Sequence, residues 1–329
     1  MPRQARIDFE GALQHVIGRS IQDTAIFKDR EDKQNFRDRI INILERSSLQ
    51  CYAWAIMDNH FHLLLQTGST PLADFMRKLL TGYSVYYNKK HARIGHVFYN
   101  RYKSILCDKD AYLLTLIRYI NLNPVKAGMV NIEKLSGYEW GSHREMISSK
   151  DCIVARDEVL SFFGEKEKEA LLGYSKFIVE GVGLDEDYDG GGLKRSAGGL
   201  NALLARKLDA KEMYDERVLG NGDFVNEVLR LTEEKENFKR KTKVISLESL
   251  QSKICAYYKI SEQEFQRGRM AHVTKAKKFF VYIANIYLEK TKVEIAKFIG
   301  VQPVSLTRLM ASMMLIEKRD LECMEILGD

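Results

Sequence analysis

Two histidines and a tyrosine are the residues in this sequence with the clearest potential for chemistry. His60 and His62 are separated by one residue, and on a strand such residues project from one face, close enough to bind one divalent ion. Tyr119 and Asn123 are four residues apart, so on a helix they share a face. If that face packs against the histidine strand, Asn123 completes the metal ligands and Tyr119 lies beside the ion. The set predicts phosphodiester transfer by a tyrosine nucleophile with a metal ion.

Each of these residues also has an ordinary structural explanation. Two histidines on a strand are often unliganded, one hydrogen-bonded and the other exposed. Tyr119 could be an aromatic residue on a helix surface, and Asn123 could cap a helix that ends before Pro124. His15, on an earlier apolar run, could be an extra ligand, a DNA contact or a core histidine. Spacing alone leaves these alternatives open.

The segments that carry these residues follow the pattern of a ferredoxin-like fold. Asp29 is a suitable cap for a helix, Pro71 can start one, and Pro124 is expected to end one. Asp58-Asn59 is suited to the turn of a hairpin. The predicted elements are a strand over 11–18, a helix over 29–46, strands over 50–57 and 60–66, a helix from 71 to about 91, a strand over 102–107 and a helix over 109–122. The chain is therefore expected to be α+β, with a βαββαβ palm.

Two longer runs carry a resemblance to a known family. They are WAIMDNHFHLL at 54–64 and RYINLNPVKAG at 118–128, and they resemble the REP-associated tyrosine transposases, which belong to the HUH single-strand endonucleases. The resemblance covers roughly residues 1–145, including Pro2-Arg3, His15-Val16 and the stretch 95–104.

This resemblance implies a ferredoxin-like catalytic domain that binds Mg²⁺ or Mn²⁺ through His60, His62 and Asn123. It also implies that Tyr119 forms a 5′-phosphotyrosine and leaves a free 3′-OH. Members of the family recognise imperfect hairpins folded from palindromic repeats. Many relatives have Gln where this chain has Tyr99, so DNA contacts near that position are expected to differ.

The net charge of +6 averages over blocks of opposite sign. Residues 1–150 hold 22 Lys and Arg against 15 Asp and Glu, 151–234 hold 11 against 19, 235–310 hold 16 against 6, and 311–329 hold 2 against 5. Two basic segments therefore flank an acidic one, which is typical of a protein that contacts a phosphate backbone at two places. Solvated helix faces are the simpler alternative.

Composition excludes several other classes of protein. The sequence has no apolar run long enough to span a membrane, so a cytoplasmic protein without a membrane partner is expected. Its five cysteines are scattered without CxxC spacing, which argues against a disulfide framework and a cysteine zinc site.

Basic residues of the first segment are candidate DNA contacts, and aromatic residues between them could stack on unpaired bases. Tyr83, Tyr86 and Tyr87 are more simply explained by packing. The candidate contacts are Arg19, Lys89, Lys90, Arg93, Arg101, Lys103 and Lys126.

The second basic segment has the pattern of a helix-turn-helix. Gly300 falls in the turn, and the exposed side of the second helix would carry Gln302, Ser305, Thr307 and Arg308. The expected core comprises Val293, Ile295, Ala296, Ile299, Val301, Val304 and Leu309. With the upstream Arg269, Lys277 and Lys278, this segment resembles the duplex-binding C-terminal domain of the replication initiator DnaA. An ordinary helical hairpin is the alternative.

We therefore expect three parts. Residues 1–147 form the catalytic domain, 148–240 an acidic helical region with a linker rich in Gly and Asp, and 241–329 an all-α helix-turn-helix domain. The predicted function is metal-dependent cutting and rejoining of single-stranded or hairpin DNA, with flanking duplex held by the last domain, in a monomer or homodimer. The alternatives are a DNA-binding regulator that does not cut and a metal phosphodiesterase acting on small nucleotides.

Overall fold

The computed structural model describes residues 6–21, 24–99, 101–148, 152–184, 188, 215–313 and 319–328. The chain divides into two compact units, Met1–Glu227 and Val228–Asp329.

The first unit is built on one sheet in the order β2-β3-β1-β4-β5. The neighbours among β1 to β4 are antiparallel. This is the predicted ferredoxin-like arrangement, and the βαββαβ order is confirmed. The elements along the chain are β1 (Leu13–Arg19), α1 (Arg30–Leu44), β2 (Gln50–Ile56), β3 (His60–Gln66), α2 (Leu72–Lys90), β4 (Lys103–Cys107) and α3 (Lys109–Lys126).

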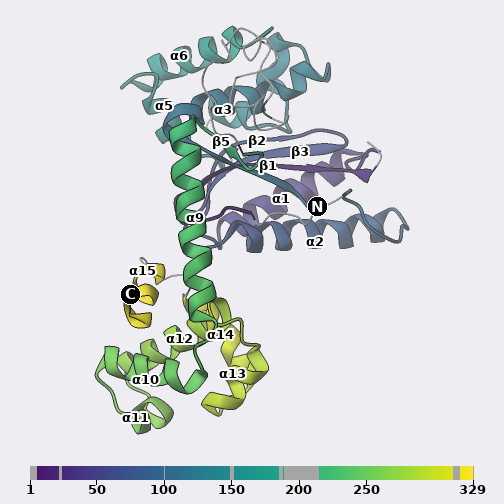
Figure 1. Ribbon diagram of the computed structural model, residues 1–329. Coiled ribbons are helices and arrows are strands. Elements are labelled where there is room, and N and C mark those ends of the chain that lie inside the picture. Colours follow the sequence, from purple (N-terminus) through teal and green to yellow (C-terminus); the bar gives the residue numbers. More distant parts are fainter. Residues whose placement is uncertain are drawn as a thin grey trace. The chain divides into compact units, whose positions relative to one another are not determined.

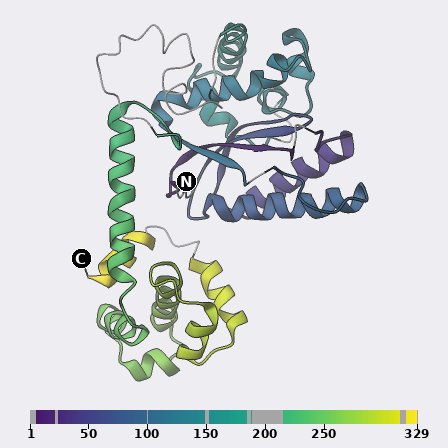
Figure 2. The same cartoon turned by 45° about the vertical axis from the view of Figure 1, so that its right-hand side comes forward.

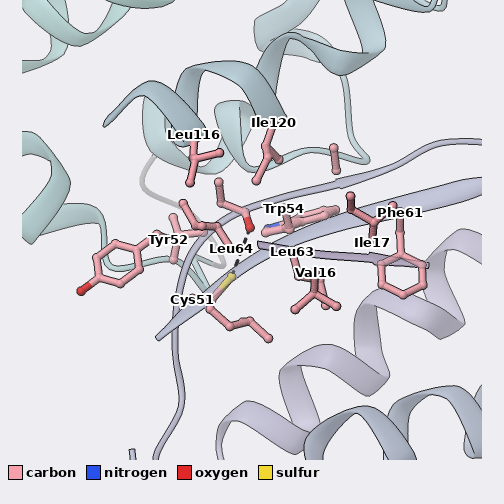
Figure 3. Packing of buried hydrophobic residues seen from close by; sticks show 14 of the residues in the cluster. Val16, Ile17, Cys51, Tyr52, Trp54, Phe61, Leu63, Leu64, Leu116 and Ile120 are labelled. Atoms are coloured by element: carbon pink, nitrogen blue, oxygen red, sulfur yellow. Dashed lines mark hydrogen bonds between the residues drawn. The ribbon is translucent and has the colours of Figure 1, made fainter. Parts of the chain in front are cut away.

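Helices cover both faces of this sheet, as Figures 1 and 2 show, with α1 and α2 on one side and α3 on the other. Side chains alternate along β3, so Phe61 contacts Phe36 of α1 while His62 contacts Tyr119 of α3. Gly18 lies opposite Phe61 in the register, and a Cβ there would come within 2.3 Å of the Phe61 ring. In Figure 3, Leu116 and Ile120 of α3 pack over the strands.

Two of the helix ends predicted from the sequence are confirmed, and one is not. Asp29 caps α1 by accepting from the backbone N–H of Asp32, and Pro71 precedes α2. The prediction that the third helix ends before Pro124 is wrong, because α3 continues to Lys126. Pro124 lies in the last turn, where it removes only the bond to the carbonyl of Ile120, while the N–H of Ala127 still bonds to the carbonyl of Asn123 and closes the helix.

The first unit extends well beyond the expected residues 1–147. The added elements are η2 (Ile132–Gly137), α4 (Ser142–Ser148), α5 (Arg156–Ser161), α6 (Glu167–Glu180) and β5 (Val218–Leu219). Asn121 of α3 donates to the Tyr174 hydroxyl of α6 at 3.3 Å, and β5 pairs in parallel with β4. Part of the acidic segment therefore completes this unit. Most of the predicted linker 181–201 lies outside the described residues.

The second unit consists of helices in the part that the structure describes. After α9 (Gly222–Thr242), which begins just before the division, it contains α10 (Leu247–Tyr258), α11 (Glu262–Arg267), α12 (Ala271–Ile286), α13 (Lys292–Ile299), α14 (Pro303–Met313) and α15 (Arg319–Leu327). Buried residues of α12, among them Phe279, Phe280 and Ile283, form its centre.

The α13–turn–α14 segment follows the expected helix and turn positions. Thr291 and Glu294 form a capping box at the start of α13, and Gly300 ends it with a φ of +68°, a conformation that favours glycine. Two of the expected core residues are corrected, since Val293 is 67% exposed and Val301 38% exposed.

The inward face of α13 consists of Ile295, Ala296 and Ile299. Val293 points away from it because it lies about 200° around the helix from Ile295. Leu306 of α14 is buried in the same core, and the side chain of Val304 lies outside the described residues.

Among the helices that the structure describes, none is long and apolar enough to cross a membrane.

Candidate active site

The sheet places the two predicted histidines on one face, toward α3. His60 lies opposite Arg19 of β1, and His62 lies opposite Ile17. The ring centroids of His60 and His62 are 5.2 Å apart and nearly perpendicular. His62 is fully buried, whereas His60 is half-buried at the end of the strand. The pair therefore has the shared orientation that the i, i+2 spacing predicts.

Each histidine has its Nδ1 atom in a hydrogen bond. His62 Nδ1 is 3.0 Å from His15 Nε2, and His60 Nδ1 is 2.6 Å from the Asn59 side-chain oxygen. In metal sites, one ring nitrogen commonly binds the ion while the other holds a hydrogen bond that fixes the ring. Nε2 of each ring is thus the atom expected to bind an ion. His15 is thus the buried hydrogen-bond partner of His62.

Helix α3 brings Tyr119 to the histidines. Its ring centroid is 6.1 Å from that of His62 and 6.0 Å from that of His15, with the rings close to perpendicular in both pairs. Lys126, two turns further along α3, places its ammonium nitrogen 4.8 Å from the Tyr119 ring centroid. Tyr119 therefore lies beside the buried His15–His62 pair and the Lys126 ammonium.

Tyr119 is only 5% exposed in this arrangement. Tyr188 also packs edge-on against it, with ring centroids 5.2 Å apart. Sequence reasoning missed this contact, because Tyr188 is distant along the chain and no local spacing signals it.

Asn123 lies on the same helix one turn beyond Tyr119, as predicted. Its side-chain nitrogen donates to the backbone carbonyl of Tyr119 at 2.9 Å. That bond orients the amide and leaves its oxygen as the atom suited to an ion. The metal role of Asn123 stays a prediction.

The donor types predicted for this site fit a divalent ion. Two imidazole nitrogens and an amide oxygen are ligands that Mn²⁺ and Mg²⁺ accept, and further positions on the ion would be open to water or phosphate. His60 and His62 project from one strand face, and their Nδ1 hydrogen bonds fix both rings. The residues present are therefore compatible with the predicted ion.

Three of the candidate DNA contacts surround this site. Arg19 lies opposite His60, and Lys103 lies opposite Ile17 on the other side of β1, so both belong to the sheet face that α3 covers. Lys126 is the cation beside Tyr119. All three residues are exposed at their ends of these elements, where they can meet a phosphate backbone.

The other candidate contacts of the first unit lie elsewhere. Lys89, Arg93 and Arg101 are exposed, and the Arg93 guanidinium lies 5.7 Å from the ring centroid of Tyr87. Tyr83 and Tyr87 are fully buried, in agreement with the packing explanation.

Lys90 is engaged in ion pairs rather than presented to solvent. Its ammonium lies 2.8 Å from Asp29 and 3.1 Å from Asp32, and the hydrogen bond from Lys90 lowers the pKa of Asp29. Asp29, Asp32 and His91 have ligand atoms within 4.8 Å of one another, a spacing that could suit a metal. The Lys90 ammonium already occupies the position between these carboxylates where a cation would bind, so we assign no ion to the cluster.

The basic residues of the second unit differ in availability. Arg269 is exposed and Lys278 is half-buried. The Lys277 ammonium donates to the backbone carbonyls of Gln266 and Gly268, at 3.2 and 3.0 Å. Burial is the main cause that lowers the pKa of Lys277.

On the predicted second helix of the helix-turn-helix, Ser305 is exposed, as is Gln302 just before it. The side chains of Thr307 and Arg308 lie outside the described residues.

Comparison with known proteins bears on the part of the chain that contains His60, His62 and Tyr119. The family model that matches is described as "Transposase IS200 like" and covers residues 10–123. Residues 10–123 match the IS200-like transposase family. This match confirms the sequence-based resemblance and indicates a DNA-processing transposase domain in about a third of the chain. It does not extend to the C-terminal helices.

One solved structure similar to this chain is that of a REP-associated tyrosine transposase bound to a REP hairpin. It has 16% sequence identity and a TM-score of 0.38, over 46% of this chain and 90% of that one. None of the curated proteins compared with this chain matches it. Residues 10–123, which match the family model, include His15, His60, His62 and Tyr119.

Proposed function

We propose that this chain cuts and rejoins single-stranded DNA, with Tyr119 as the nucleophile. The observation that carries the proposal is the position of Tyr119, whose ring centroid lies 6.1 Å from that of His62, with His60 on the same strand face. The family match supports a transposase role for the same segment. A phenol beside a potential metal site is suited to nucleophilic attack on a phosphodiester.

The proposed step forms one bond and breaks another. The Tyr119 oxygen attacks phosphorus and loses its proton to solvent, while the bond from phosphorus to the 3′ oxygen breaks and that oxygen takes up a proton. The products are a 5′-phosphotyrosine and a free 3′-OH. Because the phosphotyrosine conserves the phosphodiester bond energy, attack by a 3′-OH reverses the step and joins strands.

The other residues would position the phosphate and the nucleophile. His60, His62 and Asn123 would hold Mg²⁺ or Mn²⁺, which when bound would act as a Lewis acid toward phosphoryl oxygens. The Lys126 ammonium beside the Tyr119 ring would stabilise negative charge that develops on the phenol oxygen or phosphate. Arg19 and Lys103 would bind neighbouring phosphates of the strand.

The substrate we propose is a hairpin with unpaired flanks, and the second unit would bind adjacent duplex. Exposed Arg269, Gln302 and Ser305 and the turn at Gly300 support a helix-turn-helix role for the second unit. On this proposal, residues 241–329 are the duplex-binding part and the sheet unit is the catalytic part.

Covalent trapping tests the proposal. Single-stranded oligonucleotides that copy palindromic repeats of the host genome, each with unpaired flanks and a fluorescent label at the 3′ end, are incubated with the protein in Mn²⁺ or Mg²⁺. The fragment attached through its 5′ phosphate then stays with the protein on a denaturing gel. We expect an adduct with the wild type and with Tyr112→Phe, a control tyrosine on α3.

Tyr119→Phe should form no adduct, and EDTA should suppress it in the wild type. An adduct that persists in Tyr119→Phe would overturn the assignment of the nucleophile. Tight DNA binding by the wild type without any adduct would favour a regulator that does not cut. Turnover of small nucleotides without an adduct would favour a phosphodiesterase.

A further inference from the structure

A cavity on the first unit is separate from the Tyr119 cluster. It has a volume of about 810 Å³ and lies between α2 and the segment before β4. We call it the α2 pocket. Its volume is within the range typical of sites for small organic groups. The residues that line it and enter the argument are Arg6, Arg77, Val85, Tyr99, Arg101 and Tyr102.

The charge of the α2 pocket favours an anionic ligand. Three arginines and His96 line it, and among the described residues no carboxylate does. A second cavity, of about 380 Å³, also contains arginines, but Glu139 and Glu145 line it with them. In that cavity the carboxylate of Glu139 pairs with Arg30 and Arg144. In the α2 pocket Arg77 pairs with Asp74 of the same helix at 3.6 Å, an exposed pair outside the lining. The three arginines therefore still leave the lining with an excess of positive charge.

The walls of the α2 pocket favour a flat aromatic group. Tyr99 is 67% exposed and Val85 65% exposed, so apolar surface is presented at the pocket. Deeper in, the Arg6 guanidinium stacks 3.8 Å from the ring centroid of Tyr102 and donates to its backbone carbonyl. The Tyr102 hydroxyl is buried, and within the described residues it has no hydrogen-bond partner. Aromatic and guanidinium planes are surfaces on which nucleobases stack.

The α2 pocket is joined to the candidate active site through the end of β1. The Tyr99 backbone N–H donates to the carbonyl of Arg19 at 3.0 Å, and Arg19 lies opposite His60. In the same segment, Arg101 lines the pocket while Lys103 pairs with Ile17 on β1. A single strand that passes His60 can thus reach the pocket around this end of the sheet.

We propose that the α2 pocket holds one unpaired base of the DNA strand, stacked on Tyr99, with the neighbouring phosphates on Arg101 and Arg77. This inference rests on the proposed single-strand activity and adds a place where a base outside the hairpin is recognised. An apolar peptide would fit against Val85 and Tyr99, but it would not explain the three arginines in the lining. A second copy of this chain would bring like charges together.

Fluorescence of 2-aminopurine tests the inference. Hairpin oligonucleotides with unpaired flanks carry this base at one unpaired position at a time and are bound to Tyr119→Phe, so that no cutting changes the signal. Stacking quenches the fluorescence, so we expect strong quenching at one position. Adding Tyr99→Ala should abolish that quenching and raise the Kd roughly tenfold, the scale of one lost base stack.

Two matched variants serve as controls. Phe162→Ala removes an aromatic side chain that is 56% exposed on the first unit, outside the residues that line the pocket. Arg46→Ala removes an exposed arginine just after α1. Neither should change the quenching, whereas Arg101→Ala should raise the Kd. An abasic site at the quenched position should weaken binding of the Tyr119→Phe protein but add little to Tyr99→Ala.

The outcomes separate this inference from the proposed function. Adduct formation by the wild type with no quenched position, or with quenching that survives Tyr99→Ala, would overturn the pocket and leave the nucleophile intact. Quenching that depends on Tyr99 without any adduct would support the pocket and contradict the cutting reaction. A change of particle mass in Tyr99→Ala by light scattering, with DNA binding unchanged, would make the pocket a self-association surface and refute the inference.

Discussion

At the scale of single residues, the candidate active site depends on histidines that are held by their neighbours. His62 is buried, and its Nδ1 atom is hydrogen-bonded to His15. His60 is held by Asn59 in the same way. Residues that hold a metal-binding histidine affect metal affinity without touching the ion. His15, which is fully buried, is therefore a positioning residue in our proposal, without a direct part in the reaction.

We predict that His15→Phe weakens Mn²⁺ binding by about 10- to 100-fold, the usual effect of removing such a partner. The phenyl ring fills the buried space of the imidazole but cannot hydrogen-bond to His62, so that ring loses its fixed orientation. Isothermal titration calorimetry with Mn²⁺ measures the Kd directly and needs no DNA.

The control for this prediction is His272→Phe, which changes an exposed histidine of the second unit. It should bind Mn²⁺ as the wild type does. An unchanged Kd in His15→Phe, with a melting temperature like that of the wild type, would show that His15 is only a core residue.

At the scale of elements, the sequence predicted what depends on local periodicity. The bounds of β3 at His60 and Gln66 agree with the predicted strand, because alternation and the Asp58-Asn59 turn fix both ends. The i, i+4 pair on α3 correctly placed Tyr119 over the sheet. Both features follow from side-chain direction within one element.

Features that depend on distant segments could not be predicted in this way. Two-residue β5 has no period of its own and is a strand only because β4 offers an edge for pairing. Lys90 looked like a phosphate contact, yet it pairs with carboxylates at the start of α1. Tyr188 reaches Tyr119 from a segment without hydrophobic period. Each of these contacts is set by tertiary packing, which sequence spacing does not show.

One buried ion pair links three elements of the first unit. Arg37 of α1 lies 2.9 Å from the Glu145 carboxylate of α4, and Trp54 of β2 donates to the same carboxylate at 3.2 Å. Burial raises the pKa of Glu145, and the hydrogen bond from Arg37 opposes that shift. Glu145 is thus a buried charge that depends on Arg37.

We predict that Arg37→Met lowers the unfolding free energy by about 3 kcal/mol at pH 7.5, as expected when one partner of a buried pair is removed. The loss should be smaller near pH 5. A carboxyl whose folded pKa is raised is most favourable to the folded state below its unfolded pKa, and this contribution falls as pH rises. Urea unfolding followed by tryptophan fluorescence measures the loss, since Trp54 and Trp140 both belong to the first unit.

The double variant Arg37→Met/Glu145→Gln provides the control. Its neutral amide still accepts from Trp54 and requires no counter-ion, so most of the lost stability should return. Equal destabilisation in the single and double variants, or a loss independent of pH, would contradict the account based on a buried charge.

At the scale of the whole molecule, basic residues are concentrated in two segments of the chain. Residues 1–150 have 22 basic against 15 acidic residues, and 235–310 have 16 against 6, with the acidic segment between them. On the proposed function, the first segment binds a single strand and the second binds duplex. The two activities should then respond independently to substitution.

We predict that Arg269→Ala weakens binding to duplex DNA and reduces the slope of log K against log salt by about 1, the effect of losing one phosphate contact. Adduct formation on a short single strand should not change, because that reaction belongs to the first unit. Lys103→Ala should do the reverse, slowing adduct formation while duplex affinity stays the same. Fluorescence anisotropy at several salt concentrations and the trapping assay give the two readouts.

Arg230→Ala is the charge-matched control for both variants. Arg230 is exposed but pairs with Glu234 on α9 at 2.7 Å, so its charge is already offset and its loss should leave the salt slope unchanged. If Arg269→Ala and Lys103→Ala instead reduced both activities in parallel, the chain would bind DNA through one continuous surface. The opposite charges of its segments would then reflect solvation of helix faces, and the two units would not bind single-stranded and duplex DNA separately.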